Sequence, residues 1–141
     1  MPFTPAVPSF EYLGRAHVTV AAPRELGQTP VGKRRIIDIT GGRIEGPQLS
    51  GIILPGGADW QIVRPDGTAV LEARYTIQTD DDALISVTNF GYRHGPPDIM
   101  AQVAAGDDVD PARYYFRAAP LFETAAPKYD WLNTTLAMTS G

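Results

Sequence analysis

Residues 69–79 read "AVLEARYTIQT" and residues 83–92 read "ALISVTNFGY", with three aspartates between them at positions 80–82. Residue types alternate through the first run. One side of an extended chain carries Ala69, Leu71, Ala73, Tyr75 and Ile77, and the other carries Val70, Glu72, Arg74, Thr76 and Gln78. This period of two is typical of a strand that buries one face. The two runs and the turn between them therefore predict an antiparallel pair of strands.

Short runs rich in β-branched and aromatic residues, separated by turn residues, continue over most of the chain. Strands are expected at 15–22, 34–40, 48–54, 60–64, 69–79, 83–92, 113–124 and 129–138. Gly41 and Gly42 are expected to form a tight hairpin turn, and Gly51 to mark a bulge or a close backbone approach. One short helix is predicted at about 98–105, because Pro97 suits its first turn and Gly106 suits its end.

About eight antiparallel strands and a single short helix restrict the possible folds. One helix cannot cover both faces of such a sheet, so the sheet must curl into a barrel or fold over as a sandwich. We favour an all-β antiparallel barrel, because an eight-stranded barrel has room for one small ligand. The 141 residues predict a single domain, residues 1–141, in which residues 1–11 form an extended N-terminal arm.

The composition restricts the partners and the chemistry. The formal net charge is −4, so neither nucleic acid nor an anionic membrane is expected as a partner. The chain has no cysteine, which excludes disulfides and thiolate chemistry and fits a cytoplasmic location. The first ten residues lack the pattern of a signal peptide. Two separated histidines form no metal motif, and no phosphate-binding loop is present, so neither a metal nor a cofactor is expected.

Residues 54–60, "LPGGADW", place an acid beside one of the two tryptophans after a proline and two glycines. The stretch is either a bend between strands or a bend that also forms the wall of a pocket. In the second interpretation Trp60 fills the core and Asp59 lies at the barrel mouth, near Arg74 or Arg117. Partial desolvation would raise the pKa of the Asp59 carboxyl toward the range useful for proton transfer.

Other polar residues in strands are further candidates, each with a structural alternative. Arg74 and Arg117 either form ion pairs, Arg74 with Glu72, or stabilise a developing oxyanion. His17 is either a base or a structural group, and the Tyr115 hydroxyl could donate a proton. Asn89 and Asn133 either pin turns or donate to a substrate carbonyl, and the expected pocket wall consists of Tyr115, Phe122 and Trp131.

Three longer stretches resemble a known family. They are "GGRIEGPQLSGIILPGGADWQIVRPDG" (41–67), "EARYTIQTDDDALISVTNFGYRHGP" (72–96) and "YYFRAAPLFETAAPKYDWLNTTL" (114–136). Together they resemble the DUF3237 family, also called UPF0311, over about residues 12–141. The resemblance implies a small β-barrel similar to those of allene oxide cyclase and dirigent-type proteins. Some fungal members of the family are reported as chalcone isomerases, which close a ring without a cofactor.

The chain also departs from the family pattern. Asp82 stands where the family usually has glycine, and the end reads "LAMTSG". The family chain commonly continues into one more strand, whereas this chain stops at Gly141. Because an uncovered sheet edge invites aggregation, we expect a homo-oligomer, most simply a dimer.

These observations favour a cofactor-independent acid–base enzyme of the isomerase/cyclase or hydratase/lyase type. Its substrate would be a small aromatic or carbonyl-containing molecule bound in the barrel lumen. The alternative is a barrel that binds a small ligand without catalysis. An enzyme should place a carboxylate, histidine or tyrosine with a shifted pKa at the cavity, whereas a binding protein could have an entirely apolar lumen.

Overall fold

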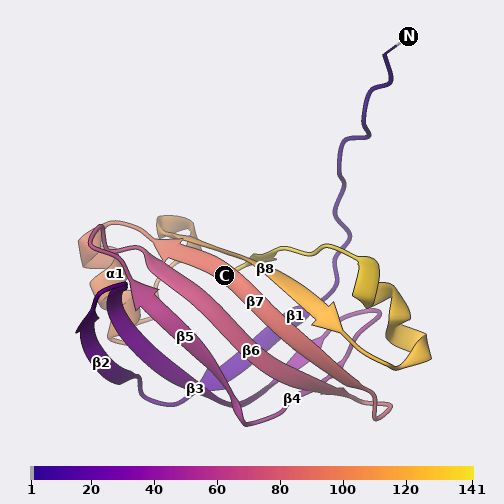
Figure 1. Ribbon diagram of the computed structural model, residues 1–141, viewed down its shortest axis with the longest axis horizontal. Helices are drawn as coiled ribbons and strands as arrows, with labels where there is room; N and C mark the ends of the chain where they lie inside the picture. Colours follow the sequence, from indigo (N-terminus) through magenta and orange to yellow (C-terminus); the bar gives the residue numbers. More distant parts are fainter. Residues whose placement is uncertain (1) are drawn as a thin grey trace.

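The computed structural model describes residues 2–141, which form an antiparallel β-barrel (Figure 1). The strands are β1 (Arg15–Val20), β2 (Arg24–Thr29), β3 (Gly32–Glu45), β4 (Gly51–Ile53), β5 (Gly57–Val63), β6 (Ala69–Thr79), β7 (Leu84–His94), β8 (Tyr115–Glu123) and β9 (Thr139–Ser140). The helices are α1 (Pro97–Ala104) and two 3₁₀ segments, η1 (Pro111–Arg113) and η2 (Pro127–Thr134). Residues 2–14 contain neither a strand nor a helix; Leu13 packs against the core, and the segment before it leads away from the barrel.

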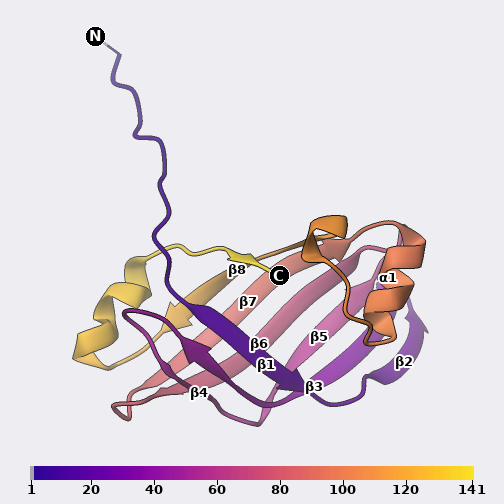
Figure 2. The ribbon, with the colours of Figure 1, turned by 180° about the vertical axis from the view of Figure 1, so that it is seen from behind.

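The hydrogen-bonded strand order is β1-β3-β4-β6-β7-β8-β9. Two short strands flank each edge of β3. On one edge β2 pairs with residues 32–36 of β3 and β1 pairs with residues 39–45. On the other edge β5 pairs with residues 33–39 and β4 pairs with residues 43–44. Because β3 is long and twisted, these four strands bend the sheet around it. Figure 2 shows the result, with β1 on the wall opposite β6 and β7.

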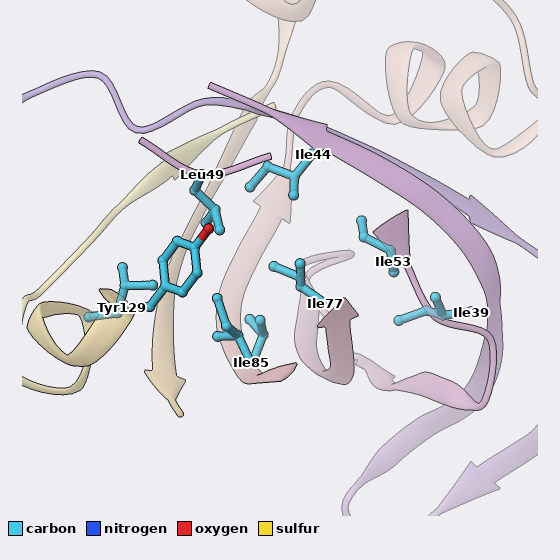
Figure 3. Close-up of a cluster of buried hydrophobic side chains, with 9 residues drawn as sticks. Ile39, Ile44, Leu49, Ile53, Ile77, Ile85 and Tyr129 are labelled. Atoms are coloured by element: carbon cyan, nitrogen blue, oxygen red, sulfur yellow. The ribbon is translucent and has the colours of Figure 1, made fainter. Parts of the chain in front are cut away.

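The apolar core fills the half of the barrel that η2 covers (Figure 3). Ile77 from β6 and Ile85 from β7 project toward Leu49 and toward Tyr129 of η2. Ile77 and Ile85 are 1% and 0% exposed. At the opposite end of the barrel α1 contributes Ile99, which is 2% exposed. The two ends are therefore closed by different elements.

Several of the predicted elements are confirmed. The central strand β6 has the predicted bounds, and β7, β8 and α1 differ from prediction by only one or two residues at each end. Gly51 is a close-approach position, since a Cβ built there would lie 2.3 Å from the carbonyl oxygen of Gln78. Of the helices within residues 2–141, none has both the length and the apolar character needed to cross a membrane. The cytoplasmic location stays a prediction.

The predicted hairpin at Gly41 and Gly42 is wrong, because β3 runs through both residues without turning. Their φ angles are 152° and 138°, and the register with β1 shifts at this point. A Cβ at Gly42 would lie 2.1 Å from the carbonyl oxygen of His17. The two glycines therefore permit a β-bulge and a close strand contact rather than a turn.

The strand predicted at 129–138 is also wrong, since residues 127–134 form the 3₁₀ segment η2. Tyr129 and Leu132 are its buried residues. Their spacing of three places them on one side of a 3₁₀ turn, which a strand would not do. Strands β2 and β9 were not predicted. The sequence of β2, "RELGQT", has little apolar alternation, and β9 has only two residues.

The stability of the barrel should depend on the apolar half. We expect Ile77→Ala to lower the free energy of unfolding by about 2–5 kcal/mol, because it removes buried methyl groups and leaves a cavity. Ile52→Ala is the matched control, because Ile52 lies on the neighbouring strand and is 45% exposed. Its cost should be under about 1 kcal/mol. Urea unfolding measures both changes, and equal losses would contradict this assignment of the core.

Candidate active site

Asp59 and Trp60 lie on opposite faces of β5, but in the reverse of the predicted orientation. Asp59 is 8% exposed and faces inward, whereas Trp60 is 39% exposed and lies on the outer face. The register explains this, because Asp59 pairs with Ile37 of β3 and Ala73 of β6, which both contact the interior. The prediction that Trp60 fills the core and that Asp59 lies at the mouth is therefore wrong.

The Asp59 carboxylate is held by two hydrogen bonds. Its Oδ1 accepts a hydrogen bond from the backbone N–H of Glu72 at 2.9 Å, and its Oδ2 accepts one from Nε2 of Gln61 at 3.1 Å. Desolvation raises the pKa of the Asp59 carboxyl above its usual value. The two hydrogen bonds and the charges of Arg93 and Arg35 act in the opposite direction. The expected neighbours Arg74 and Arg117 are not among these groups.

Three buried polar atoms have no hydrogen-bond partner among residues 2–141: Nε of Arg35, Oε1 of Gln61 and Oδ1 of Asn89. Their positions in the sheet place them around Asp59. Arg35 pairs with Gln61 across β3 and β5, while Ala73 pairs with Asp59 on one side and with Asn89 on the other. Unpaired polar atoms are costly inside a protein, so such a group needs an explanation.

Arg93 completes this group from the inner face of β7. It pairs with Ala69 of β6 and Phe116 of β8, and its guanidinium lies 5.8 Å from the centre of the Phe116 ring. Burial lowers the pKa of the Arg93 guanidinium, and the charge of Arg35 lowers it further. We call Arg35, Asp59, Gln61, Asn89 and Arg93 the polar cluster. The Arg35 side chain is 20% exposed, so the cluster is in contact with solvent.

Other predicted residues lie on the outer surface, away from Asp59. The Arg74 side chain is 65% exposed, and its Nη2 lies 3.5 Å from Oε1 of Glu72. Arg74 therefore forms the ion pair that was its structural alternative. Tyr115 stacks on His94 at 4.8 Å, and the Arg117 guanidinium lies 5.3 Å from the Tyr115 ring. Tyr115 and His94 line an open surface pocket of about 470 Å³. His17 is exposed on β1.

The remaining candidates lie near η2. Phe122 packs against the apolar core. Trp131 is 37% exposed and lines a second surface pocket of about 640 Å³. Asn133 lies in η2 rather than in a strand, and its amide bonds the backbone N–H and the carbonyl of Thr124. It pins a turn, which is one of the two roles that the sequence left open.

The polar cluster therefore contains two predicted residues, Asp59 and Asn89, and three that were missed. A signal for the missed residues exists in the strand alternation. Arg35 is in phase with the buried Ile37 and Ile39, and Arg93 is in phase with Ile85 and Val87. A charged residue at an inward position is a candidate functional group, because burying it costs energy. Across residues 2–141, no set of three His, Asp or Glu side chains could hold a metal ion.

The family model described as "Protein of unknown function (DUF3237)" matches residues 8–141. The chain belongs to the DUF3237 family, as its motifs indicated. A UPF0311 protein of Rhodopseudomonas palustris is 47% identical over 106 residues, which cover 75% of this chain and 69% of that protein. The hydroalkoxylation enzyme phnH of Penicillium herquei is 32% identical over 133 residues, which cover 94% of this chain and 74% of that protein.

Solved structures support the same fold. A conserved protein of unknown function from Rhodopseudomonas palustris superposes with a TM-score of 0.87 at 40% identity, covering 96% of this chain and 89% of that one. A β-barrel-like protein from Acinetobacter baumannii superposes with a TM-score of 0.77 at 48% identity, covering 96% and 88%. The barrel is thus shared with proteins that this chain resembles in sequence.

The buried carboxyl should make stability depend on pH. Because folding raises the pKa of Asp59 above 3.8, its contribution to stability is fully present below that pH. The contribution is lost as pH rises through the folded-state pKa. Asp59→Asn cannot titrate, so this variant should lose less stability than the parent as pH rises from about 4 to neutral. Urea unfolding at several pH values measures the difference.

Asp66→Asn is the control with the opposite sign. The hydrogen bond from Arg64 lowers the pKa of the Asp66 carboxyl, so Asp66 stabilises the fold above its unfolded-state pKa. Removing it should cost stability at neutral pH but not in acid. If Asp59→Asn and the parent showed the same pH dependence, the carboxyl of Asp59 would not be desolvated as described.

Proposed function

We propose that this protein is a cofactor-independent acid–base enzyme acting on a small molecule inside the barrel. The reaction would be an isomerisation, a ring closure, or an addition or elimination. One observation carries the proposal: the buried carboxylate of Asp59 accepts a hydrogen bond from Gln61, and the amide oxygens of Gln61 and of Asn89, two strands away on the same face of the sheet, have no partner among residues 2–141. A barrel interior that served only stability would pair such atoms or replace them with apolar groups.

Asp59 is the proton-transfer group in this proposal. Desolvation raises the pKa of the Asp59 carboxyl above its usual value, which favours the protonated form and suits the group to proton transfer. Its hydrogen bond with Nε2 of Gln61 leaves Oε1 of that amide free to accept a hydrogen bond. Gln61 and Asn89 each present an acceptor oxygen, so they would orient a hydroxyl or amine of the substrate.

The fungal relative supports this class of chemistry, because its name describes hydroalkoxylation. Adding an alcohol across a carbon–carbon double bond breaks one O–H bond and the π bond of the alkene, and it forms one C–O bond and one C–H bond. Neither oxidation nor reduction is involved. In this chain, protonated Asp59 would give its proton to the alkene carbon, and the hydroxyl held by Gln61 or Asn89 would attack. The proton released from the hydroxyl would return to Asp59, which restores the starting state.

The test begins with a thermal-shift screen of compounds that contain both a hydroxyl and an alkene, followed by turnover assays of the hits. A ligand at 100 times its dissociation constant should stabilise the protein by about 2.7 kcal/mol. Asp59→Asn should lower turnover by about 100-fold or more while ligand binding persists. The matched control is Asp108→Asn, an exposed acid far from the cluster in sequence, which should leave turnover unchanged.

Two outcomes would change the assignment. If Asp59→Asn were as active as the parent, Asp59 would not be the proton-transfer group. If ligands bound in the interior but none was turned over, the protein would be the non-catalytic binding barrel instead. The unpaired amide oxygens would then serve recognition alone.

We also propose that the protein is a homo-oligomer. β1 is hydrogen-bonded only to β3 in residues 2–141, and all six of its residues are exposed. At the other end of the order, β9 covers only Arg117 and Ala118 of β8. Both edges offer unpaired backbone groups on which a second copy could add a strand.

Light scattering at micromolar concentrations should therefore show a dimer or larger species. Val20→Lys, which places a charge on the exposed edge of β1, should shift the population toward monomer. Leu84→Lys is the control, because Leu84 is similarly exposed but lies on the central strand β7. A monomeric parent protein would contradict the proposal.

A further inference from the structure

Arg93 is a partly buried cation without a carboxylate partner. Within residues 2–141 it forms no ion pair, and its side chain donates no hydrogen bond to the protein. The Phe116 ring lies under its guanidinium at 5.8 Å, which orients the planar group without neutralising it. Its donors are therefore available to a ligand.

Arg35 faces the interior from β3, its charge acts on Arg93, and it is also poorly paired. Its Nε is buried without a partner. Its Nη1 lies 3.8 Å from Oε1 of Glu25, which is too far for a hydrogen bond, and the Glu25 side chain is 49% exposed. A solvated pair at this distance contributes little. Arg35 thus keeps most of its donors for another acceptor.

The polar cluster consequently carries excess positive charge. Two guanidiniums share one carboxylate, and both oxygens of Asp59 already accept hydrogen bonds from Glu72 and Gln61. Burial lowers the pKa of the Arg93 guanidinium, the charge of Arg35 lowers it further, and the charge of Asp59 acts in the opposite direction. Excess charge in a protein interior is costly unless a counter-ion balances it. This is notable in a chain whose net charge is −4.

We infer that Arg35 and Arg93 form a subsite for a carboxylate of the substrate, while Gln61 and Asn89 accept a hydroxyl of the same molecule. The guanidinium fork matches a planar carboxylate in two parallel hydrogen bonds. This inference rests on the proposed function, because it names the substrate class for the same interior cluster. The substrate would be a small hydroxycarboxylic acid.

The separation of Arg93 from Asn89, rather than that of Arg35 from its cross-strand neighbour Gln61, favours an acid with its hydroxyl at the far end. Arg93 and Asn89 are four residues apart on the inner face of β7, which is about 13 Å of strand. A carboxylate and a hydroxyl on adjacent carbons would not span from one to the other. An aromatic ring between them would, and 4-hydroxybenzoate is a simple probe of this kind.

The first experiment compares probes by calorimetry on the unmodified protein. We expect 4-hydroxybenzoate to bind in the millimolar range or tighter. The neutral analogue 4-hydroxybenzyl alcohol should bind roughly 10-fold or more weakly, because it lacks the charge-assisted hydrogen bonds. Benzoate, which lacks the hydroxyl, should also bind more weakly than 4-hydroxybenzoate. Inorganic phosphate distinguishes a carboxylate subsite from a general anion site.

The second experiment uses variants. Arg93→Gln and Arg35→Gln should each weaken binding of 4-hydroxybenzoate roughly 10-fold or more and leave the alcohol unaffected. Arg113→Gln is the control, because Arg113 is an exposed arginine of η1, and it should bind all probes as the parent does. If the interior variants fail to fold, the comparison of acid with alcohol in the parent still decides the question.

The outcomes separate this inference from the proposed function. If the acid bound no better than the alcohol, if no probe bound, or if binding did not depend on Arg35 and Arg93, the subsite would be wrong. Competition by phosphate at equal strength would also contradict a carboxylate subsite. Asp59→Asn should still bind 4-hydroxybenzoate. Arginine-dependent binding together with a fully active Asp59→Asn would support the subsite and contradict the catalytic role of Asp59.

Discussion

The register across β3, β5, β6 and β7 is the constraint on which the candidate site depends. Ile37, Asp59, Ala73 and Asn89 follow one another across these four strands, each opposite the next. Because side chains alternate between faces, a shift of one residue in any of these pairings would exchange an inward group for an outward one. Asp59 would then lie in solvent and Trp60 would enter the barrel. The geometry of the carboxylate is thus a property of the whole sheet.

The interior of the barrel has two halves that differ in polarity. The half under η2 is closely packed by apolar side chains such as Ile77 and Ile85, and burial there supplies much of the stability of the fold. The other half contains the polar cluster, in which buried polar atoms lack partners. Proteins tolerate such groups where function requires them and other regions supply the missing stability.

Much of the barrel could be predicted from local patterns, because β6 and β7 alternate clearly and their turn is short. The orientation of Asp59 could not be predicted. Ile52, Ile53 and Leu54 are all apolar, so the sequence does not show which residues of the following strand face inward. Gly41 and Gly42 suit a turn and a bulge equally well, and only the pairing with β1 distinguishes them. Strand alternation alone places Arg35 and Arg93 at inward positions, but only the pairing of strands that are distant in the sequence shows that both belong to one polar cluster.

Under the proposed function, Ala73 would set the size of the molecule that the candidate site accepts. Its side chain is a single methyl group, and it lies in the sheet between the strand of Asp59 and the strand of Asn89. A valine or leucine there would occupy volume between the acid and the amide without disturbing any backbone hydrogen bond of β6. Under that proposal, the selectivity of the barrel would change through one position of β6 whose own side chain takes no part in the chemistry.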